Sequence, residues 1–358
     1  MPNAAMPLAS ARPSLVVEGQ LASDLAASLQ HMEVRERSDG MAQAQLGFGN
    51  WGLRDGAPGY TLFGRDRLEF GKKIEVKLGD SLLFVGRVMA LQALFPVGGA
   101  GEAQLMVQLE DRLQDLRMQR RSRSFAQMSL ADIARQIASD HGLQASVNLS
   151  GPSHAVLAQV NQSDLAFLRE RARSAEAELW VEGDSLHLAS RAQRAAEPIA
   201  LDYGGTLQSF EVRADLALQR TELSVSGWSV ADKLALKETA QPSLLDAELD
   251  GGQGGATLLQ QAFGARPDVL AHLNPANADE ARSFAESWLK QIGRRFVVGH
   301  GVAQPNARLR PGASVKLAGL GPLFNGHYAV SAVCHRFDLD QGLRSEFTVE
   351  RAAIGRGL

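Results

Sequence analysis

Short segments in which apolar and polar residues alternate recur along most of this chain, and they constrain its fold more than any other feature. Ile74, Val76 and Leu78 alternate with Glu75 and Lys77, and a period of two returns near residues 104–110, 222–226, 328–335 and 346–350. This period places one row of side chains in a core and the other in solvent. The segments are separated by turn signals at Asp39-Gly40, Asp55-Gly56, Gly79-Asp80 and residues 98–101. The pattern predicts many short strands in small barrels or sandwiches.

Three helical segments interrupt the β pattern. Ser129 is a candidate N-cap for a helix near 129–141, and Ser163 begins a second helix near 163–176. Asn277 and Glu280 form a capping-box pattern before a third helix near 278–292. The order is β, helices, β, helix, β, which predicts an α+β chain that is mainly β.

Two further signals concern the connections. The glycine-rich stretch at 251–255 is expected to form a loop or linker, and Asn325-Gly326 is a strong hairpin signal. The β pattern occupies residues 15–112, 201–230 and the C-terminal part of the chain. The β regions could be copies of one barrel type, although no sequence repeat is evident.

Composition argues against several classes of protein. Lys and Arg number 37 against 40 Asp and Glu, so the net charge is -3 and no nucleic-acid partner is expected. Cys334 is the only cysteine, which excludes an internal disulfide and a cysteine-rich metal site. The N-terminus lacks the pattern of a signal peptide, and no apolar run is long enough to span a membrane. We therefore expect a chain made in the cytoplasm, without direct membrane insertion.

The histidines and the cysteine form no complete catalytic or metal-binding pattern. His300 and His327 are expected at turns or strand ends, and His335 on the outward row of a strand. Cys334 is assigned to the buried row that also contains Tyr328. No third ligand is spaced near these histidines as a zinc site would require.

Other polar motifs also have structural explanations. Asp338 to Gly342 is explained more simply by a hairpin turn than by a calcium loop, and Gly98 to Gly101 lacks the Lys-Ser or Lys-Thr of a phosphate loop. The cluster Arg117 to Arg123 is interpreted as a solvated connector or a charged subunit contact, because no aromatic residues interleave it. No catalytic, metal-binding or cofactor-binding residue is assigned, and no cofactor is expected.

Three stretches of the chain form a pattern through their order and spacing. The first begins at Asp111-Arg112 and continues through the Arg-rich segment and the helix 128–143. The second is 161–172, which includes Ser163-Asp164 and Phe167-Leu168. The third contains Pro311-Gly312, Asn325-Gly326 and His335. Taken together, these stretches resemble the late control D family of contractile phage tails, which is related to the N-terminal hub part of VgrG. The resemblance implies a structural role for ten motif residues: Asp111, Arg112, Ser163, Asp164, Phe167, Leu168, Pro311, Gly312, Asn325 and Gly326.

The resemblance implies a structural hub: a homotrimer whose two β-barrels per chain form a pseudo-six-fold ring. The first barrel would be 1–112, and the second would combine 201–232 with 294–358. A mixed α/β region would collect 113–200 and 233–293. Such a ring is a symmetry adaptor between a hexameric tail tube and a central spike, in contact with other baseplate components. The protein would be a non-enzymatic part of an assembled phage-like particle made in the bacterial cytoplasm.

The end of the sequence shortly after the second β region is expected to leave the spike to a separate protein. This favours a phage tail or a phage-tail-like contractile injection system. Two other classes stay open. A cell-wall glycan hydrolase needs two placed carboxylates, and 40 acidic residues always offer some pair. A stand-alone binding module with two β domains would be a stable monomer.

Overall fold

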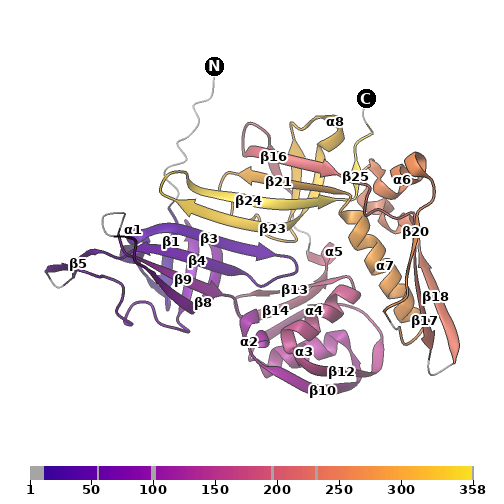
Figure 1. Ribbon diagram of the computed structural model, residues 1–358, viewed down its shortest axis with the longest axis horizontal. Helices are drawn as coiled ribbons and strands as arrows, with labels where there is room; N and C mark the ends of the chain where they lie inside the picture. Colours follow the sequence, from indigo (N-terminus) through magenta and orange to yellow (C-terminus); the bar gives the residue numbers. More distant parts are fainter. Residues whose placement is uncertain are drawn as a thin grey trace.

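A sheet of 13 strands dominates the computed structural model, which describes residues 12–54, 56–97, 102–194, 197–229, 233–273 and 275–356. Figure 1 shows this sheet across the upper and left parts of the molecule, with helices and smaller sheets below it and to the right. Every helix in the described part of the chain is too short or too polar to span a bilayer.

The large sheet contains two groups of strands, each around its own apolar core. The first β unit consists of β1 Ser14–Val17, β2 Gln20–Leu21, β3 Leu29–Arg37, β4 Gln43–Gly49, β7 Lys73–Leu78, β8 Ser81–Leu94 and β9 Gln104–Glu110. The second β unit consists of β15 Ile199–Asp202, β16 Leu207–Ala214, β21 Val297–Ala303, β22 Ser314–Ala318, β23 Gly326–Asp338 and β24 Gly342–Arg351. Leu46 and Val107 are fully buried in the first core, and Val315 and Val349 in the second.

The two β units share one strand order. Five antiparallel strands follow the order β3-β4-β9-β8-β7 in the first unit and β16-β21-β24-β23-β22 in the second. The first strand of each unit lies beside the last of these five, but β1 is antiparallel to β7 whereas β15 is parallel to β22. The units are thus related by topology, although their sequences show no repeat.

One antiparallel pairing joins the two units into a continuous sheet. Residues 31–37 of β3 lie opposite residues 332–338 of β23. Phe337 and Leu343 of the second unit also pack in the first unit's core. Because backbone hydrogen bonds and a shared core cross this boundary, the two units form a single body.

A mixed α/β region follows the first unit in sequence and lies below the sheet in Figure 1. It contains α2 Leu113–Arg117, β10 Arg120–Ser129, α3 Leu130–Asp140, β11 Gln144–Asn148, β12 Ser153–Ser163, α4 Asp164–Ser174, β13 Ala177–Glu182, β14 Ser185–Ser190 and α5 Arg191–Arg194. Ser129 caps α3 as predicted, and the structure adds a capping box with Asp132; α4 begins at the predicted place, and the Ser163 side chain caps it. Ile133 and Phe167 are fully buried in the core beneath these helices.

A second insertion, between β16 and β21, forms a small sheet packed on a long helix. The sheet contains β18 Leu234–Ala240, β17 Glu222–Ser229 and β20 Pro267–Leu270 in that order. Its apolar face covers α7 Ala278–Arg294, which Asn277 caps as predicted. The remaining elements are α1 Ser23–Ser28, β5 Gly52–Arg54, β6 Ala57–Gly59, η2 Pro242–Glu248, β19 Gln253–Gly254, α6 Gly255–Phe263, α8 Gly321–Phe324 and β25 Ala353–Ile354.

This insertion corrects two predictions. Residues 222–232 were expected in the second β-barrel, but β17 pairs with β18 and β20. Alternation at Leu223 and Val225 indicates that one face of the strand is buried, but it does not identify the sheet to which the strand belongs. The expected loop at 251–255 instead contains β19, which pairs with β25, and the start of α6. Gly255 allows close packing there, because a Cβ atom would lie 2.7 Å from the Phe296 ring.

A β-bulge explains the wrong assignments of His335 and Cys334. The register of β23 against β24 shifts between Val330 and Ala332, so the buried row changes from Tyr328 and Val330 to Val333, His335 and Phe337. His335, predicted to face outward, is 1% exposed. Cys334, predicted to lie in the core row, is half-buried on the other face.

Other turn predictions have mixed outcomes. The hairpin at Asp338 to Gly342 is confirmed, because β23 and β24 meet there. Asn325-Gly326 is not a two-residue hairpin: α8 lies in the connection from β22 to β23, and Asn325 ends that helix. His300 lies inside β21 and not at a strand end. The stretch Gly98 to Gly101 and the turn residue Asp55 lie outside the described residues.

We predict that Ser129→Ala destabilises the protein by about 1 kcal/mol, because the Asp132 backbone N–H at the start of α3 loses its acceptor. Urea unfolding followed by circular dichroism measures this. Ser139→Ala is the matched control, since Ser139 is exposed near the other end of α3 and its substitution should change stability by less than about 0.5 kcal/mol. Equal effects of the two substitutions would contradict the capping role.

Candidate functional site: the junction of the β units and its supports

Glu33 is the centre of the charged contacts across the β3–β23 junction. Its buried carboxylate accepts hydrogen bonds from Arg35 at 2.6 Å, Arg336 at 2.7 Å and the Cys334 thiol at 3.4 Å. Burial alone would raise the pKa of Glu33, but the hydrogen bonds from Arg35 and Cys334 and the charge of Arg336 hold it below its usual value. Glu33 therefore stays ionised and connects the two strands.

Cys334 itself is unsuited to nucleophilic chemistry. Burial, together with the neighbouring Glu33 carboxylate, raises the pKa of the thiol to about 11. A thiol with such a pKa is almost entirely protonated at neutral pH, and the thiolate is the reactive form. The residue functions as a weak hydrogen-bond donor at the junction.

Two further buried groups lie beside this contact. Glu36 of β3 accepts a hydrogen bond from the Arg310 Nε atom at 3.0 Å, while its Oε1 atom has no hydrogen-bond partner among the described residues. Burial raises the pKa of Glu36 above its ordinary value. The His335 Nδ1 atom lies 2.9 Å from the Ser345 hydroxyl, and burial with the charge of Arg310 lowers the pKa of His335 to about 4. The imidazole is neutral at neutral pH.

The first pair of motif residues, Asp111 and Arg112, anchors the first β unit to the mixed region. Asp111 accepts from the backbone N–H of Ala42 at 2.8 Å and of Leu113 at 2.9 Å. Its burial outweighs these bonds and raises its pKa to about 7. Arg112 donates to Asp115, to Asp184 and to the His141 carbonyl. Both residues therefore fix the start of α2.

The second group of motif residues surrounds the first turn of α4. The Ser163 hydroxyl accepts from the Ala166 N–H, and Asp164 is 1% exposed. Asp164 lies within hydrogen-bond distance of side chains from three other elements, namely Arg123 at 2.7 Å, Gln159 at 2.8 Å and His141 at 2.8 Å. Burial alone would raise the pKa of Asp164, but the bonds from His141 and Gln159 and the charge of Arg123 outweigh this effect and hold the pKa below its usual value. Phe167 and Leu168 are fully buried in the core below.

The Asp164 cluster corrects the interpretation of the Arg-rich segment. Residues 120–129 form β10, paired with β12, and not a solvated connector. Arg121 and Arg123 both form ion pairs with Asp140 and Asp164. Arg117 pairs with Glu110 at 2.6 Å, so three of the four arginines are neutralised within the chain, which leaves little net positive charge for a ligand.

The remaining motif residues lie in turns of the second β unit. Gly312 has φ +85° and donates to the Val330 carbonyl, and a Cβ atom there would lie 2.3 Å from the Arg194 side chain. Pro311 precedes it in the same buried turn. Gly326 has φ +140°, and its Cβ would lie 2.8 Å from the Arg351 guanidinium. Asn325 accepts from the Leu320 N–H. The ten motif residues therefore occupy separate supporting positions and form no single site.

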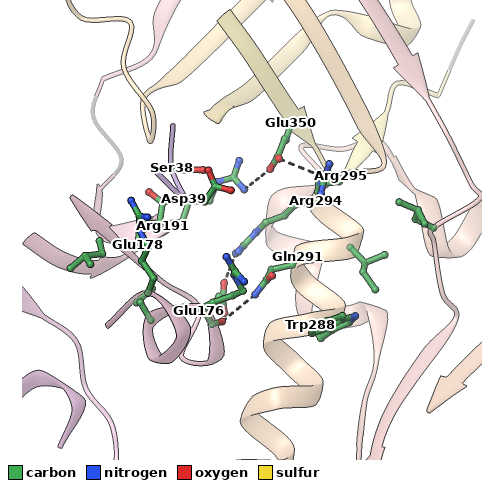
Figure 2. Close-up of a pocket in the computed structure, with 17 residues that line it drawn as sticks. Ser38, Asp39, Glu176, Glu178, Arg191, Trp288, Gln291, Arg294, Arg295 and Glu350 are labelled. Carbon is green, nitrogen blue, oxygen red and sulfur yellow. Dashed lines mark hydrogen bonds and ion pairs between the residues drawn. The ribbon is translucent and has the colours of Figure 1, made fainter. Parts of the chain in front are cut away.

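Sequence reasoning missed a cleft where the mixed region, α7 and β24 meet. It has a volume of about 350 Å³, and Figure 2 shows Glu176, Arg294, Arg191 and Glu350 around it. Arg294 pairs with Glu176 at 2.6 Å, and Arg191 pairs with Glu350 at 3.3 Å. These residues come from four distant segments, so no local signal could have grouped them. Among the described residues, no cluster of three His, Cys, Asp or Glu side chains could hold a metal ion.

Tail proteins of bacterial prophages share this fold. The 43 kDa tail protein of prophage MuSo2 from Shewanella oneidensis matches with a TM-score of 0.70 and 13% identity, over 96% of this chain and 99% of its own. A tail protein from Neisseria meningitidis MC58 matches with a TM-score of 0.69 and 13% identity, over 95% and 96%. The E. coli c3393 protein, a type VI secretion component similar in structure to the T4 tail proteins gp27 and gp5, matches with a TM-score of 0.56 and 12% identity, over 90% and 73%.

The chain therefore has the fold of this class of tail protein. Residues 10–338 match the model of the Alg8 N-terminal domain family, and the chain belongs to that family. No curated protein matches it in sequence. The predicted likeness to phage tail proteins is confirmed at the level of the fold, while the family model that matches is the Alg8 N-terminal domain and not late control D.

We predict that the free energy of unfolding decreases more steeply with falling pH in the unsubstituted chain than in His335→Gln. The pKa of His335 is about 4 in the folded state against 6.5 ordinarily, so the unfolded chain takes up its proton first as the pH falls. The contribution of His335 is complete above about pH 6.5, and roughly 2 to 3 kcal/mol of it is lost between about pH 7 and about pH 4.5. Urea unfolding of His335→Gln across this range should show a shallower slope. His300→Gln, at an exposed histidine of β21 in the same sheet, should keep the steep slope of the unsubstituted chain.

We also predict that Asp164→Asn destabilises the protein by about 3 kcal/mol, because Arg123 loses its buried counter-charge. Asp140→Asn is the matched control: it contacts the same arginine, but its carboxylate is 31% exposed, and its loss should cost less than about 1 kcal/mol. Thermal and urea unfolding measure both. An Asp164→Asn effect no larger than that of Asp140→Asn would contradict the central role of Asp164.

Proposed function

We propose that this protein is the hub of a phage tail or a phage-tail-like contractile injection system, related to the late control D proteins. Three copies form a symmetry adaptor that joins a hexameric tail tube to a separate central spike, among other baseplate components. The observation that carries the proposal is the fold shared with tail proteins over nearly the whole chain. The finished protein acts as part of the assembled particle.

The repeated strand order supports this function. Each chain carries two β units of one topology, so three chains present six similar units to a hexameric tube. We propose that these units are the two barrels, the first within 1–112 and the second from 199–221 and 294–358, since β15 begins at Ile199. The mixed region and the insertion with α7 lie outside them and can contact other baseplate proteins. A structural role among partner proteins is also consistent with a sequence in which we find no complete catalytic pattern.

A measurement of solution mass tests the proposal. Three times 38.4 kDa is about 115 kDa, and we expect ring-shaped particles of that mass by light scattering and negative-stain microscopy. The measurement is repeated with the tube and spike proteins of the same particle, because a hub can require its spike to assemble. A chain that stays monomeric with both partners would refute the hub. Lytic activity that is lost on substitution of one Asp or Glu would instead favour the glycan hydrolase.

A further inference from the structure

The repeat of the two β units extends to individual residues. In both units the fourth of the five antiparallel strands carries a bulge, between Val88 and Ala90 in β8 and between Val330 and Ala332 in β23. The first of the five strands also carries a bulge in both, between Leu29 and His31 and between Leu207 and Ser209. Equivalent bulges give an equivalence of residues: Leu29 with Leu207 and Val88 with Val330.

Hydrogen bonds and strand registers confirm this equivalence independently. Gly71 donates to the Val88 carbonyl at 2.8 Å, and Gly312 donates to the Val330 carbonyl at 2.9 Å, with φ near +80° at both glycines. Across the successive strands of the first unit, Leu29 lies opposite Phe48, Phe48 opposite Leu105, and Leu105 opposite Ala93. In the second unit, Leu207 lies opposite Ala303, Ala303 opposite Ser345, and Ser345 opposite His335. Ala93 is therefore the counterpart of His335, as the bulges require.

Only one of the two equivalent strand edges is occupied within the chain. On β23, the edge beyond the bulge is paired with β3. The same edge of β8, from Ala90 to Leu94, has no strand partner among the described residues. The counterpart of β3 is β16, and within the described part of the chain its outer edge from Ser209 to Ala214 is likewise without a strand partner. The chain thus contains both halves of a second junction, on different units.

Burial differs between the occupied and the open junction in the way that a missing partner strand predicts. Met32, Glu33 and Val34 of β3 are all buried. Their counterparts in β16, residues 210–212, are half-buried or exposed. At the end of β8, Leu94 is 38% exposed and Phe95 is 63% exposed. Unpaired strand edges of this kind are templates for pairing with another chain.

We propose that β16 of one copy pairs antiparallel with the end of β8 of the next copy, in the register of the β3–β23 junction. Transfer of that register places Gln92 opposite Arg213, Leu94 opposite Glu211 and Phe95 opposite Phe210. The contact is head-to-tail, because each copy donates a different edge, and such contacts form a ring where the rotation between copies closes and an open filament where it does not. The number of copies, three, rests on the proposed function; the pairing itself rests on the internal repeat.

Disulfide cross-linking tests the register directly. Gln92→Cys and Arg213→Cys are combined in a Cys334→Ala background, so that only the new pair can bridge. Residues directly opposite in an antiparallel pair have Cα atoms about 4.5 to 5.5 Å apart, within the range for a disulfide. After mild oxidation we expect covalent oligomers ending in a closed trimer on a non-reducing gel, and monomers after reduction.

The matched control moves one cysteine along the same strand. Gln92→Cys with Gln208→Cys separates the two residues by about five strand positions, roughly 16 Å, which a disulfide cannot bridge. Equal cross-linking of both pairs would overturn the register. Trimers in solution that fail to cross-link through Gln92→Cys and Arg213→Cys would overturn the pairing and leave the hub standing. Covalent rings of another size would support the pairing and refute the trimeric hub. Absence of both oligomers and cross-links would overturn the pairing.

A charge test needs no cysteine. In the β3–β23 junction the counterpart of Leu94 is Arg336, which forms an ion pair with Glu33 at 2.7 Å. Leu94→Arg should therefore form an ion pair with Glu211 of the next copy, whereas Leu94→Glu should repel it. We expect Leu94→Glu to weaken self-association by up to roughly five-fold per interface relative to Leu94→Arg. Restored association on combining Leu94→Glu with Glu211→Arg would support direct contact, and an equal effect of both charges at position 94 would contradict it.

Discussion

The backbone hydrogen bonds between β3 and β23 make one sheet of two β units, and the placement of the other regions depends on them. The mixed region is inserted between the units, and the α7 region is inserted inside the second unit. Glu33 and Glu36 reinforce the pairing with ion pairs to Arg336 and Arg310. A buried carboxylate is favourable only when its partners are correctly placed. A shift of register would leave these buried charges without their partners, so the contacts favour the observed register of the junction.

Polar contacts also hold the inserted regions to the sheet. Asp111 connects α2 to the segment before β4, whereas Asp164 acts within the mixed region, where it gathers side chains from β10, from β12 and from His141 at the end of α3. The cleft in Figure 2 is bordered by ion pairs that join the mixed region to α7 and to β24. None of these contacts forms a reactive constellation. In each case a polar side chain connects elements that are distant in sequence.

The sequence predicted those features that depend on neighbouring residues. Ser129, Ser163 and Asn277 start helices because a side-chain oxygen a few residues away satisfies a free backbone N–H. Alternation located most strands for the same local reason. It could not assign β17 to its sheet, and it failed at Ala332 because a single bulge reverses which face is buried. The partners of Arg123 were also beyond reach, since they lie between 17 and 41 residues away.

The two equivalent junctions differ in chemistry, and this difference bears on how the chain behaves alone. The filled edge of β23 presents His335 and Arg336, whereas the open edge of β8 presents Ala93 and Leu94. Proteins that remain monomeric usually protect an exposed edge with charged residues, and residues 88–97 contain none. The opposing edge of β16 does carry charge, at Glu211 and Arg213. The proposed pairing joins one edge of each kind, as the β3–β23 junction does within the chain, and this makes the contact between copies head-to-tail.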